Sequence, residues 1–360
     1  MKLKLLKRSL FFVFTIVTIQ DTYSQTLETQ IDSVLATVFK NKNEPGAVFL
    51  VAKNGKSIYR KAFGKSNIEL DVDMLPENVF QIGSMTKQFT AIAVMMLEEQ
   101  NKLNVNDTVS KFIPEYPNGN NITLHHLLTH TSGIKDFTKM KSIMSIAKED
   151  LTPKELVDFL KDEPAVFKPG EKFEYNNSGY VILGYVIELI TGNTYEDFIE
   201  TNIFEKLAMN NSRYANDREI VKNRAYGYHN RGDFTNKMYV SLNIPYASGS
   251  LMSTVDDMLK WQEAIDNNLL VSQRTIDKVF RKNSLNTGEQ FDYGYGWHLK
   301  AIEGVPTREH GGSIFGFKSM GIYVPSLDIY VIGFSNCDCN SPTKAARTIA
   351  ALAIPNFNKK

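Results

Sequence analysis

A short apolar segment breaks at a glycine and a helix begins at the next residue in the stretch Phe80-Gln-Ile-Gly-Ser-Met-Thr-Lys87. Ser84 and Lys87 are three positions apart, which puts both side chains on one face of a helix. The amino terminus of that helix offers backbone N–H groups to a developing oxyanion. Lys87 can take the serine proton if burial lowers its pKa from ~10.4 by ~3 units. The stretch therefore predicts a nucleophilic serine with a lysine base.

The S-x-x-K spacing alone is weak, because Ser145 to Lys148 and Ser341 to Lys344 share it. Ser145 lies in a charged segment without a preceding strand or glycine, and Ser341 is explained as the N-cap of a helix that starts near a proline. The context favours Ser84. A plain N-cap followed by a solvated lysine remains the alternative reading of Ser84.

A second candidate element is Tyr175-Asn176-Asn177, which follows Pro169-Gly170 and comes directly before a predicted helix. Y-x-N also occurs at 116–118, 214–216 and 228–230, so the loop before Tyr175 is what distinguishes it. A phenol beside Lys87 could relay a proton to a leaving group, and the carboxamide of Asn177 could hold a substrate amide. A buried tyrosine with a satisfied hydroxyl is the structural alternative.

A third element is His310-Gly311-Gly312-Ser313, between two late strand candidates. Glycines let a substrate lie against a strand edge, and the N–H of Ser313 could complete an oxyanion hole with that of Ser84. The alternative is a glycine bulge at a strand end with His310 on the surface.

The surrounding sequence predicts a sheet built from both ends of the chain. A helix is expected over 27–40, and two strands, 47–53 and 57–62, flank Asn54-Gly55, a dipeptide typical of a two-residue hairpin turn. Further helical periods lie near 84–97, 152–161, 178–191, 195–206, 254–266 and 343–352, and late strands are expected at 296–301, 319–324 and 329–334. We expect an α/β fold with a sheet from 45–83 and 290–355, a helical lobe over 84–285, and a cleft between them.

Composition and missing motifs exclude several classes. The 360 residues are 42% hydrophobic and 22% charged, as in a folded globular protein. Forty-one Lys and Arg against 40 Asp and Glu give no basic excess, so nucleic acid is not an expected partner. The sequence has no G-x-S-x-G, H-E-x-x-H, Walker A or G-x-G-x-x-G motif, so an α/β-hydrolase, a zincin and a nucleotide enzyme lose their main support.

The first 24 residues are typical of a secretory signal. Four basic residues within 1–8 precede an apolar run over 10–19, and Thr22 and Ser24 supply small residues before a cleavage site. An uncleaved anchor is the alternative, but ten residues at ~1.5 Å each do not span ~30 Å of hydrocarbon. The prediction is a periplasmic or secreted mature chain over 25–360, with a net charge of about −2 and no integral membrane span.

Cysteines and histidines are interpreted as structural. Cys337 and Cys339 are two positions apart, ~6.6 to 6.8 Å in an extended chain, so we expect free or incidental thiols. A redox or metal-binding pair is the alternative, but no second pair of ligands lies nearby in the sequence. His125, His126 and His130 lack the acidic partner of a zincin, and packing or capping roles are expected for them. No metal or cofactor is predicted.

The three elements occur together in the order found in one family. The chain resembles the serine β-lactamase and penicillin-binding-protein superfamily, in the branch of class C β-lactamases, DD-peptidases, D-aminopeptidases and family VIII carboxylesterases. The likeness covers about residues 30–355. It includes Ser84 to Lys87, Tyr175 to Asn177, His310 to Gly312, Ile122-Thr-Leu-His-His-Leu-Leu-Thr-His-Thr-Ser-Gly133, Ala247-Ser-Gly-Ser-Leu-Met-Ser-Thr254 with Asp257 and Trp261, and Tyr293-Gly-Tyr-Gly-Trp297.

This resemblance implies a fold and a set of roles. The fold would be serine β-lactamase/transpeptidase-like, an antiparallel sheet flanked by helices plus an all-α lobe. Ser84 would be the acylated nucleophile, Lys87 and Tyr175 would share the base and acid work, and Asn177 would position the acyl substrate. His310, Gly311, Gly312 and Ser313 would form the substrate-binding strand, without metal or cofactor.

Two departures affect the expected substrate. The β-lactamase motif K-T-G is here His310-Gly311-Gly312, which weakens recognition of a substrate carboxylate because histidine is largely neutral at neutral pH. We therefore expect an acyl hydrolase of esters or amides, such as an esterase, a D-aminopeptidase or a DD-carboxypeptidase-like enzyme. A penicillin-binding or sensing module with little turnover, a class C-type β-lactamase and a catalytically idle scaffold remain alternatives. The partner would be a small-molecule or peptide acyl substrate, with a cell-wall origin left open.

Overall fold

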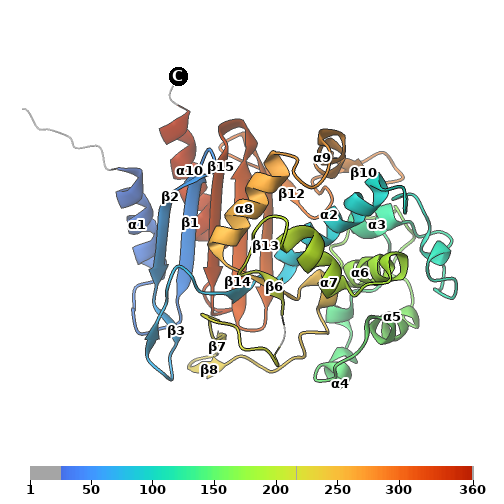
Figure 1. The fold of residues 1–360 in the computed structure, drawn as a ribbon, viewed down its shortest axis with the longest axis horizontal. Coiled ribbons are helices and arrows are strands. Elements are labelled where there is room, and N and C mark those ends of the chain that lie inside the picture. Colours follow the sequence, from blue (N-terminus) through green and yellow to red (C-terminus); the bar gives the residue numbers. More distant parts are fainter. Residues whose placement is uncertain (1–25, 216, 359–360) are drawn as a thin grey trace, which may run out of the picture.

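A computed structural model describes residues 26–215 and 217–358, so the predicted signal segment lies outside the described residues. Its main feature is a six-stranded antiparallel sheet in the order β12-β13-β14-β15-β1-β2 (Figure 1). The strands are β1 (Ala47–Lys53), β2 (Lys56–Phe63), β12 (His298–Ile302), β13 (Val305–Ile314), β14 (Phe317–Val324) and β15 (Ile329–Ser335). The first and last parts of the chain therefore meet in one sheet, with β1 paired to β15.

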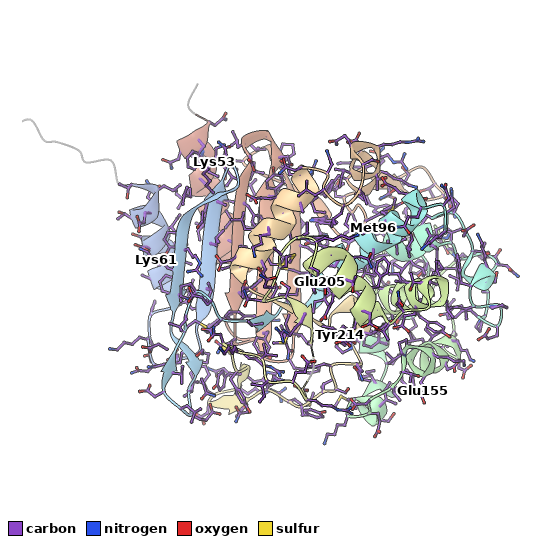
Figure 2. All side chains as sticks on the ribbon, viewed as in Figure 1. Lys53, Lys61, Met96, Glu155, Glu205 and Tyr214 are labelled. Carbon is purple, nitrogen blue, oxygen red and sulfur yellow. A yellow bond between two sulfur atoms is a disulfide. The ribbon has the colours of Figure 1, made fainter. Side chains whose placement is uncertain are left out.

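The hairpin between β1 and β2 forms where the sequence predicts it. Asn54 and Gly55 both have positive φ, 50° and 69°, the backbone that a two-residue turn of this type requires. All of β1 except Lys53 is buried, because it lies inside the sheet, whereas β2 is an edge strand. On β2, Lys61 lies near the outer margin of the molecule (Figure 2) and binds Asp32 of the first helix at 2.7 Å. A charged edge of this kind opposes pairing with other chains.

Helices cover both faces of the sheet. On one face, α1 (Leu27–Val38) packs beside α10 (Thr343–Phe357), and apolar residues of both helices form a core with the strands (Figure 1). On the other face, α8 (Val255–Asp266) packs against β1 and β15. Beyond α8, α2 (Thr86–Glu99) belongs to the largest apolar cluster and is buried from Thr86 to Leu97. Because α2 is enclosed by its neighbours, polar side chains in its first turn are buried too.

The segment between the two parts of the sheet contains several helices together with short strands and loops. Its other helices are α3 (Leu124–Leu128), α4 (Ile143–Ile146), α5 (Pro153–Lys161), α6 (Asn177–Thr191), α7 (Tyr195–Ile199) continued by a π-helix (Glu200–Phe204), and α9 (Gln273–Val279). Short strands also occur: β3 (Lys65–Asn67), β4 (Val72–Asp73), β5 (Phe80–Gln81), β6 (Arg213–Tyr214), β7 (Tyr228–Asn230), β8 (Phe234–Asn236), β9 (Leu251–Ser253), β10 (Asn283–Ser284) and β11 (Gln290–Phe291). Strand β5 leads into Gly83 and pairs with β9 rather than with the main sheet.

The last part of β13 pairs with a neighbouring strand on one side only. Strand β12 pairs with β13 only over 305–309, so residues 310–314 pair with β14 alone among the described residues. This open edge contains the whole His-Gly-Gly-Ser element. The sequence placed that element between two strands, and the structure places it inside one. No helix of residues 26–215 and 217–358 combines the length and apolarity needed to cross a bilayer.

The prediction of free thiols is wrong, because Cys337 and Cys339 form a disulfide. The prediction assumed an extended chain after the last strand. The backbone instead leaves the extended conformation after Ser335, and the two Cα atoms come within 5.1 Å of each other, inside the range that a disulfide bridges.

Candidate active site

Ser84 lies in a 3-10 turn, Gly83–Met85, which leads into α2. Gly83 has φ +54°, and a Cβ at this position would lie 2.9 Å from the backbone nitrogen of Ser313 on β13. A Cβ at Gly312 would lie 2.0 Å from the carbonyl oxygen of Ile82. Two glycines therefore let the backbone of β13 approach the serine turn more closely than side chains would permit. The hydroxyl of Ser319 on β14 donates to Ile82 at 2.8 Å and ties the turn to the sheet.

Lys87 is fully buried one turn after Ser84. Its Nζ lies 3.1 Å from Ser84 Oγ, 2.8 Å from Asn177 Oδ1 and 2.8 Å from the carbonyl oxygen of Ser248. Burial lowers the pKa of Lys87 to about 7, and the negative charge of Asp136 opposes part of this effect. At neutral pH a large fraction of Lys87 is therefore an uncharged amine.

The three neighbours of Lys87 determine how that amine is oriented. A neutral amine has two N–H donors and one lone pair, whereas an ammonium has three donors and no acceptor. The carbonyl oxygens of Asn177 and Ser248 accept hydrogen bonds but cannot donate them at those atoms. When both are satisfied by N–H groups, the lone pair is left for the hydroxyl proton of Ser84. The neutral amine of Lys87 can thus accept the hydroxyl proton of Ser84.

Tyr175 lies directly over this amine. The Nζ of Lys87 is 4.9 Å from the centre of the Tyr175 ring. The Tyr175 hydroxyl is buried and has no hydrogen-bond partner of normal geometry among the described residues. Burial raises the pKa of Tyr175 above its ordinary value, and the nearby Ser84 offsets part of that rise. The side chain is therefore a neutral phenol at physiological pH, able to donate or pass on a proton.

Asn177 opens α6, whose N-cap is Asn176. Its Oδ1 accepts from Lys87, and its Nδ2 donates to Asp136 at 3.0 Å. Asp136 is buried and also receives the backbone N–H of Asn177 at 3.4 Å. The carboxamide is thus fixed between an amine and a carboxylate. Reasoning from the sequence missed both Asp136 and Ser248, although Ser248 lies inside one of the motifs that carry the family resemblance.

Exposure increases along the His-Gly-Gly-Ser element, since His310 is buried, Gly311 and Gly312 are half-buried and Ser313 is exposed. Ser313 lines the cleft that contains Ser84, but His310, Gly311 and Gly312 do not. His310 is buried behind Tyr175, with 6.0 Å between the ring centres. Its Nδ1 lies 2.6 Å from the carbonyl oxygen of Gly311, and its Nε2 lies 3.2 Å from the hydroxyl of Tyr293. Burial holds the pKa of His310 well below its usual range, so the ring is neutral.

The other histidines support the loops around the site. His126 closes a capping box with Thr123 at the start of α3, and Nδ1 of His125 lies 2.7 Å from the hydroxyl of Tyr295. The buried His130 has φ +59° and accepts the backbone N–H of Asn176 at 3.1 Å. These contacts confirm the predicted packing and capping roles, and His130 in particular holds the loop that presents Tyr175.

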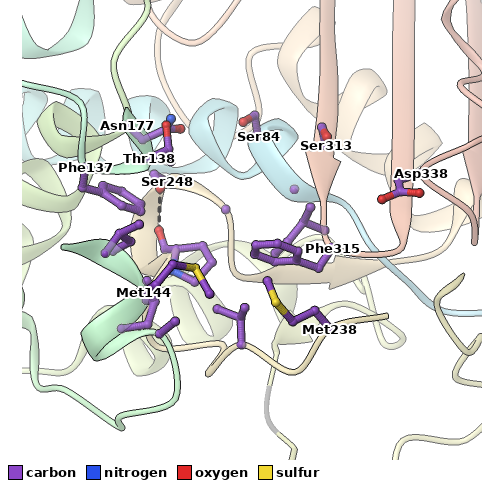
Figure 3. A pocket seen from close by; sticks show the side chains of 18 of the residues that line it. Ser84, Phe137, Thr138, Met144, Asn177, Met238, Ser248, Ser313, Phe315 and Asp338 are labelled. Atoms are coloured by element: carbon purple, nitrogen blue, oxygen red, sulfur yellow. Dashed lines mark hydrogen bonds between the residues drawn. The ribbon is translucent and has the colours of Figure 1, made fainter. Parts of the chain in front are cut away.

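A cleft of about 600 Å³ opens above Ser84. Ser84, Asn177 and Ser313 lie along one side of it, and Phe137, Met144, Met238 and Phe315 surround the opposite side (Figure 3). Met144 belongs to α4 and Phe137 to the 3-10 turn before it, whereas Met238 follows β8 and Phe315 lies in the hairpin between β13 and β14. The cleft therefore combines a polar reacting edge with an apolar wall, an arrangement common in sites for small ligands.

Known proteins share this sequence and fold. A family model described as Beta-lactamase matches residues 31–354. Penicillin-binding protein 4* of Bacillus subtilis is 30% identical over 309 residues, which are 80% of this chain and 68% of that protein. An octameric penicillin-binding protein homologue from Pyrococcus abyssi is 32% identical, with a TM-score of 0.80 over 91% of this chain and 77% of that chain.

A more distant structure has the same fold. D-amino acid amidase from Ochrobactrum anthropi SV3 has a TM-score of 0.80 over 92% of this chain and 99% of that chain, at 21% identity. These likenesses agree with the antiparallel sheet and flanking helices described above, and they confirm the predicted fold class. The chain belongs to the β-lactamase family, as its sequence motifs predicted.

Proposed function

We propose that this protein is a serine hydrolase that cleaves esters or amides through an acyl-enzyme on Ser84. The observation that carries the proposal is the buried amine of Lys87, 3.1 Å from Ser84 Oγ, with its pKa lowered to about 7. A surface lysine would be protonated at neutral pH and could not act as a base. A base with a pKa near the working pH is the most effective general base.

In the first step of the proposed reaction, Lys87 takes the hydroxyl proton while Ser84 Oγ attacks the substrate carbonyl carbon. The new O–C bond converts the carbonyl oxygen into an oxyanion, for which the backbone N–H groups of Ser84 and Ser313 are the proposed donors. The close approach of Gly83 to Ser313 supports this pairing.

In the second step, the bond to the leaving group breaks and the leaving atom needs a proton. Tyr175 is proposed to deliver it from Lys87, because its phenol is neutral and its hydroxyl is not held by another partner of the described chain. Water then attacks the acyl-enzyme by the same route in reverse and regenerates Ser84. Asn177, fixed by Asp136, is proposed to keep Lys87 oriented and to contact the acyl group.

The apolar wall of the cleft favours substrates with an apolar acyl or side-chain group, and a peptide or a small ester both suit its size. A neutral His310 in place of the lysine of K-T-G argues against an efficient β-lactamase. We therefore propose an esterase, a D-aminopeptidase or a DD-carboxypeptidase-like activity in preference to lactam hydrolysis. Cell-wall fragments are among the candidate substrates.

The test is the turnover of p-nitrophenyl acyl esters by wild-type protein and Ser84→Ala. We expect the variant to fold like the wild type and to lose turnover by about 10³-fold or more, because removing the nucleophile leaves no acyl-enzyme route. Trapping the acyl group on Ser84 by mass spectrometry would support the mechanism. A folded Ser84→Ala protein with undiminished turnover would refute it.

A second candidate function is a penicillin-binding module that is acylated and hardly turns over. The names of relatives at 30% and 32% identity, penicillin-binding protein 4* and a penicillin-binding protein homologue, favour it. A fluorescent penicillin that labels the wild type stably, but not Ser84→Ala, would select this function if no ester or lactam is hydrolysed.

We also propose a periplasmic or secreted location. The basic and apolar segments within residues 1–24 support it, and so does the disulfide between Cys337 and Cys339, since disulfides persist mainly in oxidising compartments. Fractionation of cells and amino-terminal sequencing of the mature protein test this location.

A further inference from the structure

A buried histidine lies behind the part of the cleft wall that contains Met238 and Phe315. It is His229 on β7, whose side chain does not itself line the cleft. Its Nε2 accepts the backbone N–H of Met238 at 3.0 Å, and its Nδ1 is hydrogen bonded to the carboxylate of Asp338. Its ring lies edge-on to that of Phe315, with 6.5 Å between the centres. All three of these neighbours line the cleft, so three separate segments of the wall meet at His229.

The contacts of His229 determine which ring nitrogen carries the proton. A backbone N–H only donates, so Nε2 of His229 has to accept and carries no hydrogen. In a neutral imidazole the proton then lies on Nδ1, which donates it to Asp338. Asp338 thus orients the ring, and the ring holds the backbone of Met238 at the start of the segment that follows β8.

Asp338 is itself held to the main sheet. It follows β15 and lies between Cys337 and Cys339, whose disulfide closes the loop around it. Its backbone N–H donates to the carbonyl oxygen of Tyr228 at 3.2 Å, and the N–H of Tyr228 donates to the carbonyl oxygen of Asn336 at 2.9 Å. A short covalent ring and two backbone hydrogen bonds therefore present the carboxylate to the imidazole from a fixed position.

The segment that begins at Met238 forms much of the cleft wall. Residues 238–249, here called the Met238 segment, follow β8, and those that line the cleft are Met238, Val240, Ile244, Pro245, Ser248 and Gly249. Near its end, the carbonyl oxygen of Ser248 accepts from Lys87, so the segment also belongs to the candidate active site. Met238 lies across the cleft from Ser84 (Figure 3). A substrate bound at Ser84 meets this part of the wall only if it has an apolar portion that extends across the cleft.

We propose that His229 is a positioning residue that fixes the Met238 segment and makes the enzyme selective for substrates whose apolar portion reaches across the cleft. The inference rests on the proposed function and narrows its substrate class to esters or amides with such a portion. His229 acts through Met238, whose backbone it holds. Loss of the imidazole would free the start of the segment and weaken its contacts with long substrates, whereas short substrates do not reach it.

The experiment compares a long and a short ester in two pairs. In the first pair the acyl group differs, as p-nitrophenyl octanoate against p-nitrophenyl acetate. In the second pair the leaving group differs, as 2-naphthyl acetate against phenyl acetate. The readout is the ratio of kcat/KM for the long ester to kcat/KM for the short ester, measured with wild type, His229→Phe, His229→Asn and His229→Gln.

We expect His229→Phe to lower this ratio at least fivefold in one of the two pairs through a higher KM for the long ester, with kcat for the short ester within twofold of wild type. His229→Asn should behave in the same way, because the shorter amide can donate to Asp338 but does not reach the N–H of Met238. It also gives the comparison if the Phe variant fails to fold. His229→Gln should stay within twofold of wild type, because its amide oxygen can replace Nε2 as the acceptor.

Two controls distinguish positioning from a general loss of stability. Asn230→Ala removes a contact of the same hairpin, the hydrogen bond that the N–H of Gly232 donates at 3.0 Å, from exposed surface outside the cleft. This variant should leave both ratios unchanged. In a Met238→Ala background, His229→Phe should lower the ratio by less than twofold, because the side chain through which it acts is already absent.

A measurement that needs no catalysis tests the anchoring directly. Hydrogen exchange is followed by mass spectrometry on peptides that cover residues 238–244. Exchange should be at least fivefold faster in His229→Phe and His229→Asn than in wild type, and close to wild type in His229→Gln and Asn230→Ala.

Equal exchange rates in wild type, His229→Phe and His229→Asn would overturn the inference, and so would ratios that stay unchanged in both pairs. A fall of equal size in Asn230→Ala would overturn it as well, because any loosening of the hairpin would then suffice. Failure of the proposed function has a different result: Ser84→Ala would still hydrolyse the esters, while the exchange rates would still report whether His229 holds the Met238 segment.

Discussion

Replacing Lys87 by methionine is expected to change both activity and the pH dependence of stability. The pKa of Lys87 is lowered from 10.5 to about 7 by burial. A fall of that size corresponds to roughly 5 kcal/mol, at ~1.4 kcal/mol per pH unit, by which the folded protein disfavours the charged amine relative to the unfolded chain. The same burial that makes Lys87 a base therefore destabilises the fold when the amine is protonated.

The direction in which stability changes with pH follows from which state, folded or unfolded, binds more protons. Below pH 7, Lys87 is protonated in both states, and the folded protein bears the whole penalty. Between pH 7 and 10.5, the unfolded chain holds a proton that the folded chain has released, so the free energy of unfolding rises with pH. From pH 7 to 9.5, Lys87 alone is expected to add about 3 kcal/mol to stability. Measurements stop at 9.5, because buried tyrosines, whose pKa values are raised, reduce stability above pH 10.

The assay is urea unfolding of wild type and Lys87→Met at pH 7.0, 8.0, 9.0 and 9.5. Taking the difference between the two proteins at each pH cancels the groups that both share. The stability of wild type relative to the variant should rise by about 3 kcal/mol over this range, while ester turnover by the variant falls by roughly 10²-fold to 10⁴-fold. Lys344→Met controls for the loss of one positive charge.

A difference between wild type and Lys87→Met that stays flat from pH 7 to 9.5 would refute the reasoning. It would mean that the folded protein holds Lys87 charged across this range, and the amine could not then serve as the base for Ser84.

Three further predictions follow from the contacts of the site. Tyr175→Phe should lower kcat by roughly 10²-fold to 10⁴-fold while leaving the thermal midpoint unchanged or higher, because the lost hydroxyl is buried without a hydrogen bond; kinetics and calorimetry check this. Asp136→Asn should move the acid limb of the kcat/KM profile below its wild-type position near pH 7, since the carboxylate raises the pKa of Lys87; an unmoved limb contradicts it. Gly312→Ala should destabilise the protein by about 1 to 3 kcal/mol in urea unfolding and lower turnover, whereas Gly311→Ala, whose Cβ would meet its neighbours at 3.2 Å or more, should have the smaller effect.

The parts of the fold that the sequence predicted are those with a local signal. The Asn54-Gly55 hairpin and the helix after Ser84 depend on residues adjacent in the chain, and their positions agree with the structure. Strand β13 was harder to predict, because histidine and two glycines interrupt the apolar pattern that identifies a strand. The disulfide was missed for a related reason: it depends on a turn after β15 that the extended-chain estimate did not include.

The site shows the same division between local and long-range information. The spacing of Ser84 and Lys87 suggested their contact, since both lie in one helical turn. Asp136 and Ser248 reach Lys87 and Asn177 from loops that lie more than 40 residues away from either of them along the chain, and no periodicity marks such an approach. The burial of Lys87 could not be predicted from the sequence either. A lysine in the first turn of a helix is usually solvated, and only the enclosure of α2 lowers the pKa of Lys87.

The residues at positions 310 and 312 of β13 are determined by the packing of the fold and not by the substrate. Gly312 faces the carbonyl of Ile82, so any side chain there would push the strand away from the serine turn, whatever the substrate. His310 is enclosed behind Tyr175 and contacts no part of the cleft surface. These positions therefore hold the reacting groups in place but leave little room to distinguish one acyl donor from another. Selectivity has to come from side chains that do reach the cleft, such as Phe137, Met144 and Met238 of its apolar wall.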